Sequence, residues 1–155
     1  MIIVLDIDDC IYPILHDVLD RELALKTLEL NVLHLVKICK KYNCDIALSS
    51  TWGKYITEDF KFIREYKDDN EKIYFEEGFK LLKPLFKYIK YINKGNRVEF
   101  ILKFTDKRIL ILDDVDLSQL ETSTSTTKIK FIKMNNFFDN FKLLTIHNFL
   151  SNNLP

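Results

Sequence analysis

The stretch IIVLDIDD, residues 2–9, places four apolar residues directly before three acids, Asp6, Asp8 and Asp9. A short continuous apolar run is typical of a strand that is buried on both faces, as strands are in a parallel sheet. In open α/β sheets, ligands bind outside the carboxyl ends of the strands. The stretch therefore predicts a parallel sheet whose ligand-binding edge carries carboxylates.

Two other segments combine a buried strand with polar side chains at its end. The segment CDIALSST, residues 44–51, ends in hydroxyls, and the segment RILILDDVD, residues 108–116, ends in carboxylates. The polar residues at these two ends are Ser49, Ser50, Thr51, Asp113, Asp114 and Asp116. Because the carboxyl ends of parallel strands meet at one edge of a sheet, we expect these groups to lie near Asp6 and Asp8.

Helical patterns separate the predicted strands. Apolar residues at helical spacing predict a helix over residues 20–42, with Asp20 at its N-cap. Pro84 predicts the first turn of a second helix, which would bury Leu85, Phe86, Ile89 and Ile92. Asn96 and Glu99 have the spacing of a capping box and predict a third helix.

The C-terminal part predicts a solvated loop over residues 121–128, an edge strand over 129–134 and a closing helix over 139–150. Residues 53–78 are polar and aromatic and favour no single assignment. Strands that alternate with helices indicate an α/β, three-layer Rossmann-like fold with a mostly parallel sheet. We expect one domain over residues 1–155, because a chain of this length forms a single core.

Composition excludes several classes of protein. Lys and Arg total 23, and Asp and Glu total 23, so the chain has no overall basic charge for nucleic acid or an anionic membrane. We expect no membrane partner, because no apolar run approaches the ~20 residues that span a bilayer. The cysteines, Cys10, Cys39 and Cys44, form no CxxC pair, which favours a reducing, cytoplasmic location.

Carboxylates gathered at one sheet edge oppose each other's ionisation, and a divalent cation removes that conflict. Oxygen ligands without paired His or Cys favour Mg²⁺ over zinc or copper. Bound Mg²⁺ commonly coordinates a substrate phosphate, and the hydroxyls of Ser50 and Thr51 are suited to donate to phosphate oxygens. The sequence therefore predicts a magnesium site that binds a phosphorylated ligand.

These segments resemble the motifs of the haloacid dehalogenase (HAD) superfamily. VLDIDDC, residues 4–10, is similar to its first motif, a strand followed by DxD. IALSS, residues 46–50, resembles the second, and ILILDD, residues 109–114, resembles the fourth. The third motif is a cation at the start of the preceding helix, for which Lys94 and Arg97 are the candidates. More narrowly, LSSTW and ILDD are similar to small HAD phosphatase domains associated with RNA repair.

The resemblance implies a Mg²⁺-dependent phosphate monoester hydrolase that forms an aspartyl-phosphate. Asp6 would be the nucleophile, and Asp8 would act as general acid and then as general base. Asp6, the backbone carbonyl of Asp8 and Asp113 would hold the metal, and Asp114 would bind it directly or through water. An acid at the position of Asp8 goes with phosphoryl transfer in this superfamily, rather than with dehalogenation.

The resemblance also implies which residues bind the transferring phosphoryl group. Ser50 would donate to it, with Thr51 beside it, and Lys94 or Arg97 would neutralise its charge. The sequence does not choose between the two cations. Ser49 would replace Ser50 if the strand ended one residue earlier.

Two residues depart from the motif, and several alternatives stay open. Asp9 stands where Gly is frequent, and Cys10 stands where Thr or Val is usual; we interpret Cys10 as a small packing residue. Trp52 could stack on a base or sugar, but a core aromatic is favoured. Residues 83–97 interleave aromatic and basic side chains, which suits a nucleic-acid contact or, as we favour, an amphipathic helix.

No large cap domain fits between the motifs, so an open site is expected. It would suit a phosphorylated small molecule, a nucleotide or a polynucleotide end. The alternatives are a catalytically inactive HAD-like domain that binds a phosphorylated partner, and a phosphotransferase. A receiver domain is excluded because the second strand, residues 44–51, ends without the phospho-accepting Asp that such a domain needs.

Overall fold

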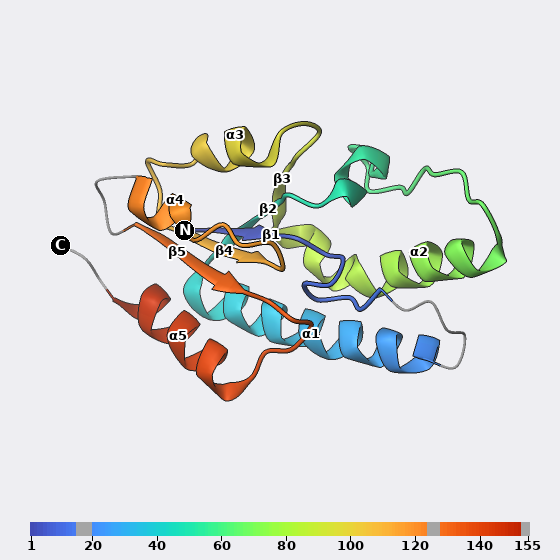
Figure 1. Ribbon diagram of the computed structural model, residues 1–155, viewed down its shortest axis with the longest axis horizontal. Coiled ribbons are helices and arrows are strands. Elements are labelled where there is room, and N and C mark those ends of the chain that lie inside the picture. Colours follow the sequence, from blue (N-terminus) through green and yellow to red (C-terminus); the bar gives the residue numbers. More distant parts are fainter. Residues whose placement is uncertain (15–19, 124–127, 153–155) are drawn as a thin grey trace.

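The computed structural model describes residues 1–14, 20–123 and 128–152. A five-stranded sheet forms its centre, with the order β3-β2-β1-β4-β5 and every pair parallel. The strands are β1 (Ile2–Leu5), β2 (Asp45–Leu48), β3 (Ile89–Ile92), β4 (Ile109–Asp113) and β5 (Ile129–Lys133). With helices on both faces, this architecture confirms the predicted three-layer α/β fold without a large cap (Figure 1).

The central strand β1 is buried on both faces, as its unbroken apolar run predicts. Its side chains alternate between two hydrophobic cores. Ile3 and Leu5 belong to the larger core, and Ile2 and Val4 belong to the smaller one. Each of these four side chains is at most 1% exposed, so β1 contributes to both cores and is covered by helices on both faces.

The helices divide into two groups, one for each core (Figure 1). The larger core is covered by α1 (Arg21–Tyr42), α2 (Asp69–Leu82) and α5 (Asn140–Ser151). The smaller core is covered by α3 (Arg97–Leu102) and α4 (Gln119–Ser123). Two short 3₁₀-helices, η2 (Thr51–Tyr55) and η3 (Lys83–Tyr88), lie between the second and third strands.

The strands on either side of β1 end level with it. Leu5 pairs with Leu48 of β2 and with Leu112 of β4. The backbone N–H of Asp6 donates to the carbonyl of Leu112 (3.1 Å). The N–H of Ser49 donates to the carbonyl of Leu5 (2.9 Å). The residues that follow the three strands therefore emerge at the same level of the sheet edge.

One predicted helix is wrong. The segment that begins near Pro84 forms the 3₁₀-helix η3 and then the strand β3, and it carries no amphipathic α-helix. The spacing of Ile89 and Ile92 suits a helix, but β-branched and aromatic residues also favour a strand. Pairing of β3 with β2 decides the outcome, so the interpretation of residues 83–97 as an amphipathic helix is also wrong.

Several other boundaries are confirmed. The first helix begins after Asp20, and the Asn96 side chain caps α3 by accepting from the N–H of Glu99 (3.0 Å). Asp139 caps α5, which matches the predicted closing helix. The unassigned segment 53–78 contains most of α2. The loop predicted over 121–128 is wrong for residues 121–123, which form the last part of α4, and residues 124–127 lie outside the described residues.

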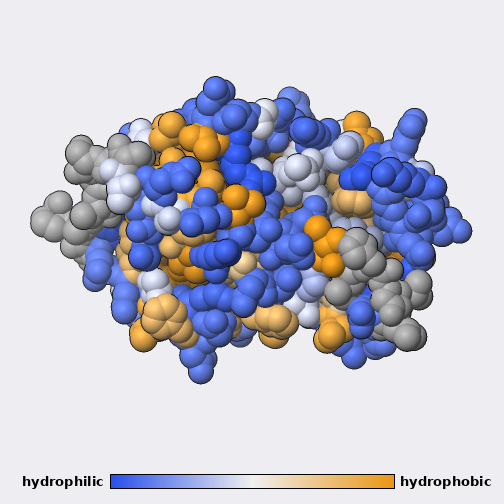
Figure 2. Space-filling model, in the orientation of Figure 1, coloured by the Kyte–Doolittle hydropathy of each residue, from blue (hydrophilic) through white to orange (hydrophobic). Residues whose placement is uncertain are grey.

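The surface is mixed. Figure 2 shows hydrophilic side chains over most of one face, with hydrophobic side chains gathered in separate groups. In the ranges that the structure describes, no helix combines the length and apolar character needed to cross a bilayer. Cys10, Cys39 and Cys44 are free and buried.

Candidate active site

Polar side chains from three neighbouring strands meet at the carboxyl edge of the sheet. Asp6 follows β1, Ser49 and Ser50 follow β2, and Asp113 is the last residue of β4. All four are buried, with at most 5% of each residue exposed. Because the three strands end at the same level, these groups lie together at the carboxyl edge of the sheet, where the sequence predicts a ligand site.

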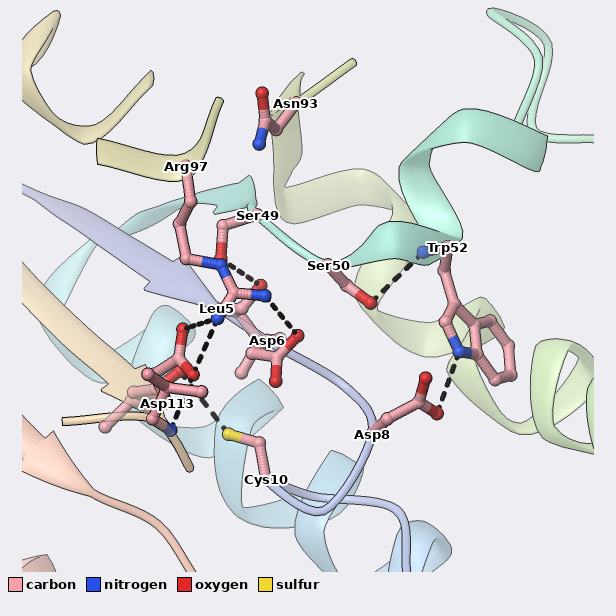
Figure 3. Close-up of polar contacts among 12 residues, drawn as sticks. Leu5, Asp6, Asp8, Cys10, Ser49, Ser50, Trp52, Asn93, Arg97 and Asp113 are labelled. Carbon is pink, nitrogen blue, oxygen red and sulfur yellow. Dashed lines mark hydrogen bonds and ion pairs between the residues drawn. The ribbon is translucent and has the colours of Figure 1, made fainter. Parts of the chain in front are cut away.

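Asp6, Asp113 and Asp114 form a carboxylate cluster. One oxygen of each lies within 4.8 Å of the others. Arg97 reaches into the cluster from the first turn of α3 (Figure 3). Its Nη1 donates to both oxygens of Asp113, at 2.9 and 2.7 Å, and its Nη2 lies 3.5 Å from Oδ1 of Asp6. Two buried carboxylates therefore share one guanidinium.

The carboxylate cluster is short of positive charge. Burial raises the pKa of Asp6, the nearby charge of Asp113 raises it further, and Arg97 offsets only part of this rise. Burial also raises the pKa of Asp113. Oxygen ligands in this arrangement fit a hard divalent cation such as Mg²⁺, whose charge would favour the ionised forms of Asp6 and Asp113.

Asp8 lies in different surroundings, although it is two residues from Asp6. Its Oδ1 accepts hydrogen bonds from Nε1 of Trp52 (3.0 Å) and from the hydroxyl of Tyr74 (2.9 Å), a pair that we call the aromatic clamp. Figure 3 shows the Asp8 carboxylate on the Trp52 side, apart from Asp113. Burial raises the pKa of Asp8, and the two hydrogen bonds oppose that rise.

The aromatic clamp is built into the larger core. Trp52 is 1% exposed, which confirms its interpretation as a core aromatic. Tyr12 stacks on Tyr74 with ring centroids 4.1 Å apart and donates to the Tyr74 carbonyl (2.8 Å). A Cβ at Gly78 would lie 2.4 Å from the Tyr12 ring, so this glycine lets α2 approach closely enough to present Tyr74. The position of Asp8 is thus set by rigid packing.

The two serines differ in how their hydroxyls are used. Ser49 Oγ donates to the carbonyl of Leu5 (3.3 Å). Ser50 is the N-cap of η2, and its Oγ accepts from the N–H of Trp52 (3.2 Å). That bond leaves the Ser50 hydroxyl hydrogen free to donate, so Ser50 is the serine that could donate to a ligand. Thr51 begins η2 and is exposed.

The two candidate cations, Lys94 and Arg97, have different partners. The Lys94 ammonium donates to the backbone carbonyls of Gly53 and Ile56, the latter at 2.6 Å. Lys94 therefore holds η2 in place, whereas Arg97 occupies the carboxylate cluster. Of the two, Arg97 is the one whose charge lies beside Asp6 and Asp113.

The two departures from the motif have structural reasons. Asp9 has φ 54°, a left-handed conformation that Gly adopts most easily and that Asp tolerates. Its Oδ1 accepts from the N–H of Ile14 (3.1 Å), which supports this conformation. The Cys10 thiol contacts the carbonyl of Leu112 (3.4 Å), and burial raises its pKa well above the ordinary value. Cys10 is therefore a packed thiol.

Sequence reasoning missed some residues of the site and included others that the structure places elsewhere. Tyr74 was missed because it lies in the segment without a clear pattern, 66 residues from Asp8. Tyr12, which supports it, resembles any core aromatic. Asp116 is exposed and accepts from the N–H of Ser118 (2.9 Å), so it forms a turn outside the carboxylate cluster.

Comparison with models of protein families, with curated proteins and with solved structures found no match for this chain. The side chains at the sheet edge are therefore the basis for a proposed function. They provide a carboxylate cluster with a guanidinium, a carboxylate on the aromatic clamp, and the hydroxyl of Ser50 between β2 and η2.

Proposed function

We propose that the protein is a Mg²⁺-dependent phosphatase of the HAD type, which hydrolyses phosphate monoesters through an aspartyl-phosphate. The observation that carries this proposal is the separation of Asp6 and Asp8. One lies in the carboxylate cluster, and the other is held by the aromatic clamp. Two nearby carboxyl groups in different environments are suited to different roles, nucleophile and proton donor. The free, buried cysteines support a cytoplasmic location.

In the first half of the reaction, a carboxylate oxygen of Asp6 forms a bond to phosphorus. The bond between phosphorus and the leaving oxygen breaks, and Asp8 gives its proton to that oxygen. Burial raises the pKa of Asp8, so the proton is available closer to neutral pH than in an ordinary carboxyl group.

In the second half, water attacks phosphorus and gives a proton to Asp8. The bond between phosphorus and the Asp6 oxygen breaks, which releases inorganic phosphate and restores both side chains. Asp8 thus ends with the proton it held at the start, and no other reactant is needed.

The remaining residues would bind the metal ion and the phosphoryl group. Asp6, Asp113 and Asp114, with the backbone carbonyl of Asp8, would hold Mg²⁺. When bound, the ion would stabilise the negative charge of the phosphoryl oxygens. Ser50 would donate its free hydroxyl hydrogen to one phosphoryl oxygen, and Arg97 would pair with another.

The test is phosphate release from p-nitrophenyl phosphate and from 5′- and 3′-nucleotides, with Mg²⁺ or with EDTA. We expect turnover that requires Mg²⁺ and is lost in Asp6→Asn. Mg²⁺ binding without turnover of any ester would favour a domain that only binds phosphorylated partners. Transfer of phosphate to added alcohols or nucleosides in preference to water would favour a phosphotransferase.

A further inference from the structure

A side pocket of about 380 Å³ opens next to Asp8, on the side of the aromatic clamp. Its polar lining comes from Asp8, Arg64, Asp68, Asn70, Glu71 and Tyr74. Asp6 and Asp113 do not line it. If Asp8 protonates the leaving oxygen, as the proposed function requires, the part of the substrate attached to that oxygen lies beside Asp8. The side pocket adjoins that position and is large enough for a small ligand.

Arg64 gives the side pocket a rigid wall. Its guanidinium lies 3.9 Å from the ring centroid of Phe75 and 4.9 Å from that of Tyr55. It is also paired with the Glu71 carboxylate, and both side chains are at least three-quarters buried. A stacked and paired guanidinium keeps its geometry, so this wall is preorganised for binding.

The other polar groups of the side pocket suit hydroxyl groups. The carboxylate of Asp68 can accept from an alcohol, although it also caps α2 by accepting from the N–H of Glu71 (2.8 Å). The amide oxygen of Asn70 accepts from Nη2 of Arg21 (2.7 Å), which leaves the amide nitrogen as the donor of that side chain. Acceptors and donors of this kind can pair with several hydroxyl groups of one ligand.

The charge of the lining disfavours anions. Apart from Asp8, the charged groups of the lining are the carboxylates of Asp68 and Glu71 and the guanidinium of Arg64, so two negative groups face one positive group. Arg64 is already neutralised by Glu71, and the positive end of α2 is already capped by Asp68. Arg21 contacts Asn70 but does not itself line the pocket, so a leaving group with a second phosphate or a carboxylate would meet a lining in which carboxylates outnumber cations.

We infer that the side pocket binds the leaving group of the substrate and selects an uncharged alcohol rich in hydroxyl groups, such as a sugar or the ribose of a nucleoside. This inference rests on the proposed phosphatase function and narrows its substrate class. A mononucleotide fits it, whereas a polynucleotide end, which carries further phosphates, does not.

Two matched pairs of esters test the inference by kcat/KM with Mg²⁺. Glycerol 1-phosphate carries a hydroxymethyl group at the position where 3-phosphoglycerate carries a carboxylate. Adenosine 5′-monophosphate and adenosine 3′,5′-bisphosphate differ by a second phosphate. We expect the uncharged leaving group to be preferred about tenfold or more in each pair, which corresponds to the removal of one unfavourable charge contact.

Asp68→Asn supplies the variant, because Asn is an equally good helix cap but has no charge. The variant should reduce both preferences about threefold or more. Asp69→Asn is the matched control: it makes the same charge change one residue further along α2, outside the lining, and should leave both preferences unchanged.

Three results would overturn the inference. A preference for the charged ester, or equal effects of Asp68→Asn and Asp69→Asn, would remove the side pocket from substrate selection while p-nitrophenyl phosphate is still hydrolysed. Absence of Mg²⁺-dependent turnover of p-nitrophenyl phosphate would overturn the proposed function and, with it, this inference.

Discussion

Asp6 and Asp8 leave the same strand two residues apart, yet their carboxylates belong to different regions of the molecule. Asp6 lies in the carboxylate cluster, which β4 and α3 complete with Asp113 and Arg97. Asp8 lies on the aromatic clamp, which η2 and α2 supply. Burial is the largest cause of the raised pKa of both carboxyl groups, but the next largest influences are charges for Asp6 and neutral hydrogen-bond donors for Asp8. The elements that pack around each acid, more than the strand itself, therefore determine what that acid can do.

Asp6→Asn should have the largest effect on activity, and it tests the role of the carboxylate cluster. The variant loses the nucleophile, so we expect no measurable Mg²⁺-dependent turnover. It also loses a crowded buried charge, so its free energy of unfolding without metal should exceed that of the wild type by about 1 to 3 kcal/mol at pH 8.

This gain in stability should depend on pH. The pKa of Asp6 is near 4 in an unfolded chain, and burial beside Asp113 raises it to about 8. The folded state therefore holds the proton more tightly, and the stability due to it is fully present below about pH 4 and lost as the pH rises through about 8. Denaturation in EDTA at pH 4.5 and 8 measures this. An equal difference at both pH values would contradict a raised pKa.

Asp8→Asn should reduce turnover by about 10² to 10⁴, as loss of a general acid does. The loss should be smaller for p-nitrophenyl phosphate than for glycerol 1-phosphate, because nitrophenolate leaves readily without a proton. Measuring kcat for both esters gives the comparison. Equal losses would show that Asp8 does not protonate the leaving group.

Arg97→Ala and Lys94→Ala should separate the two cations. Arg97→Ala should lower kcat/KM about 10²-fold, because it removes a charge placed to meet the phosphoryl group. Lys94→Ala should act mainly on stability, by about 1 to 2 kcal/mol, because it leaves the carbonyls of Gly53 and Ile56 without their donor. Kinetics and denaturation of both variants measure this. The reverse pattern would assign the phosphate contact to Lys94.

Tyr74→Phe should have the smallest effect on activity, and it tests how the aromatic clamp acts on Asp8. It removes one of the two donors to Oδ1 of Asp8, at a cost of about 1 kcal/mol in stability. Those hydrogen bonds favour the ionised form, so their loss should raise the pKa of Asp8 further. The limb of the pH–rate profile that reports Asp8 should move to higher pH. Phe79→Leu on the same helix serves as a control for packing, and a profile unchanged in both variants would separate Tyr74 from catalysis.

Much of the fold and part of the site could be predicted from the sequence. Three short apolar runs, each followed by acids or hydroxyls, are local patterns, and they became the three central strands β1, β2 and β4. The caps at Asn96 and Asp139 are also local, since each joins residues three apart. Parallel pairing then brings the strand ends together without further information.

The tertiary structure decided the rest. Ile89 and Ile92 suit either a helix or a strand, and pairing with β2 selects the strand. Lys94 and Arg97 are equivalent in the sequence, and packing of α3 and η2 sends one to the carboxylate cluster and the other to backbone carbonyls.

The sequence by itself determined which chemical groups stand at the end of each strand, because an apolar run and its end are local. The partners of Asp8, Trp52 and Tyr74, were decided by the tertiary structure alone. Tyr74 reaches Asp8 across 66 residues, through a close approach that Gly78 allows. Long-range contacts of this kind depend on the shapes of several packed elements, and no pattern along a single segment records them.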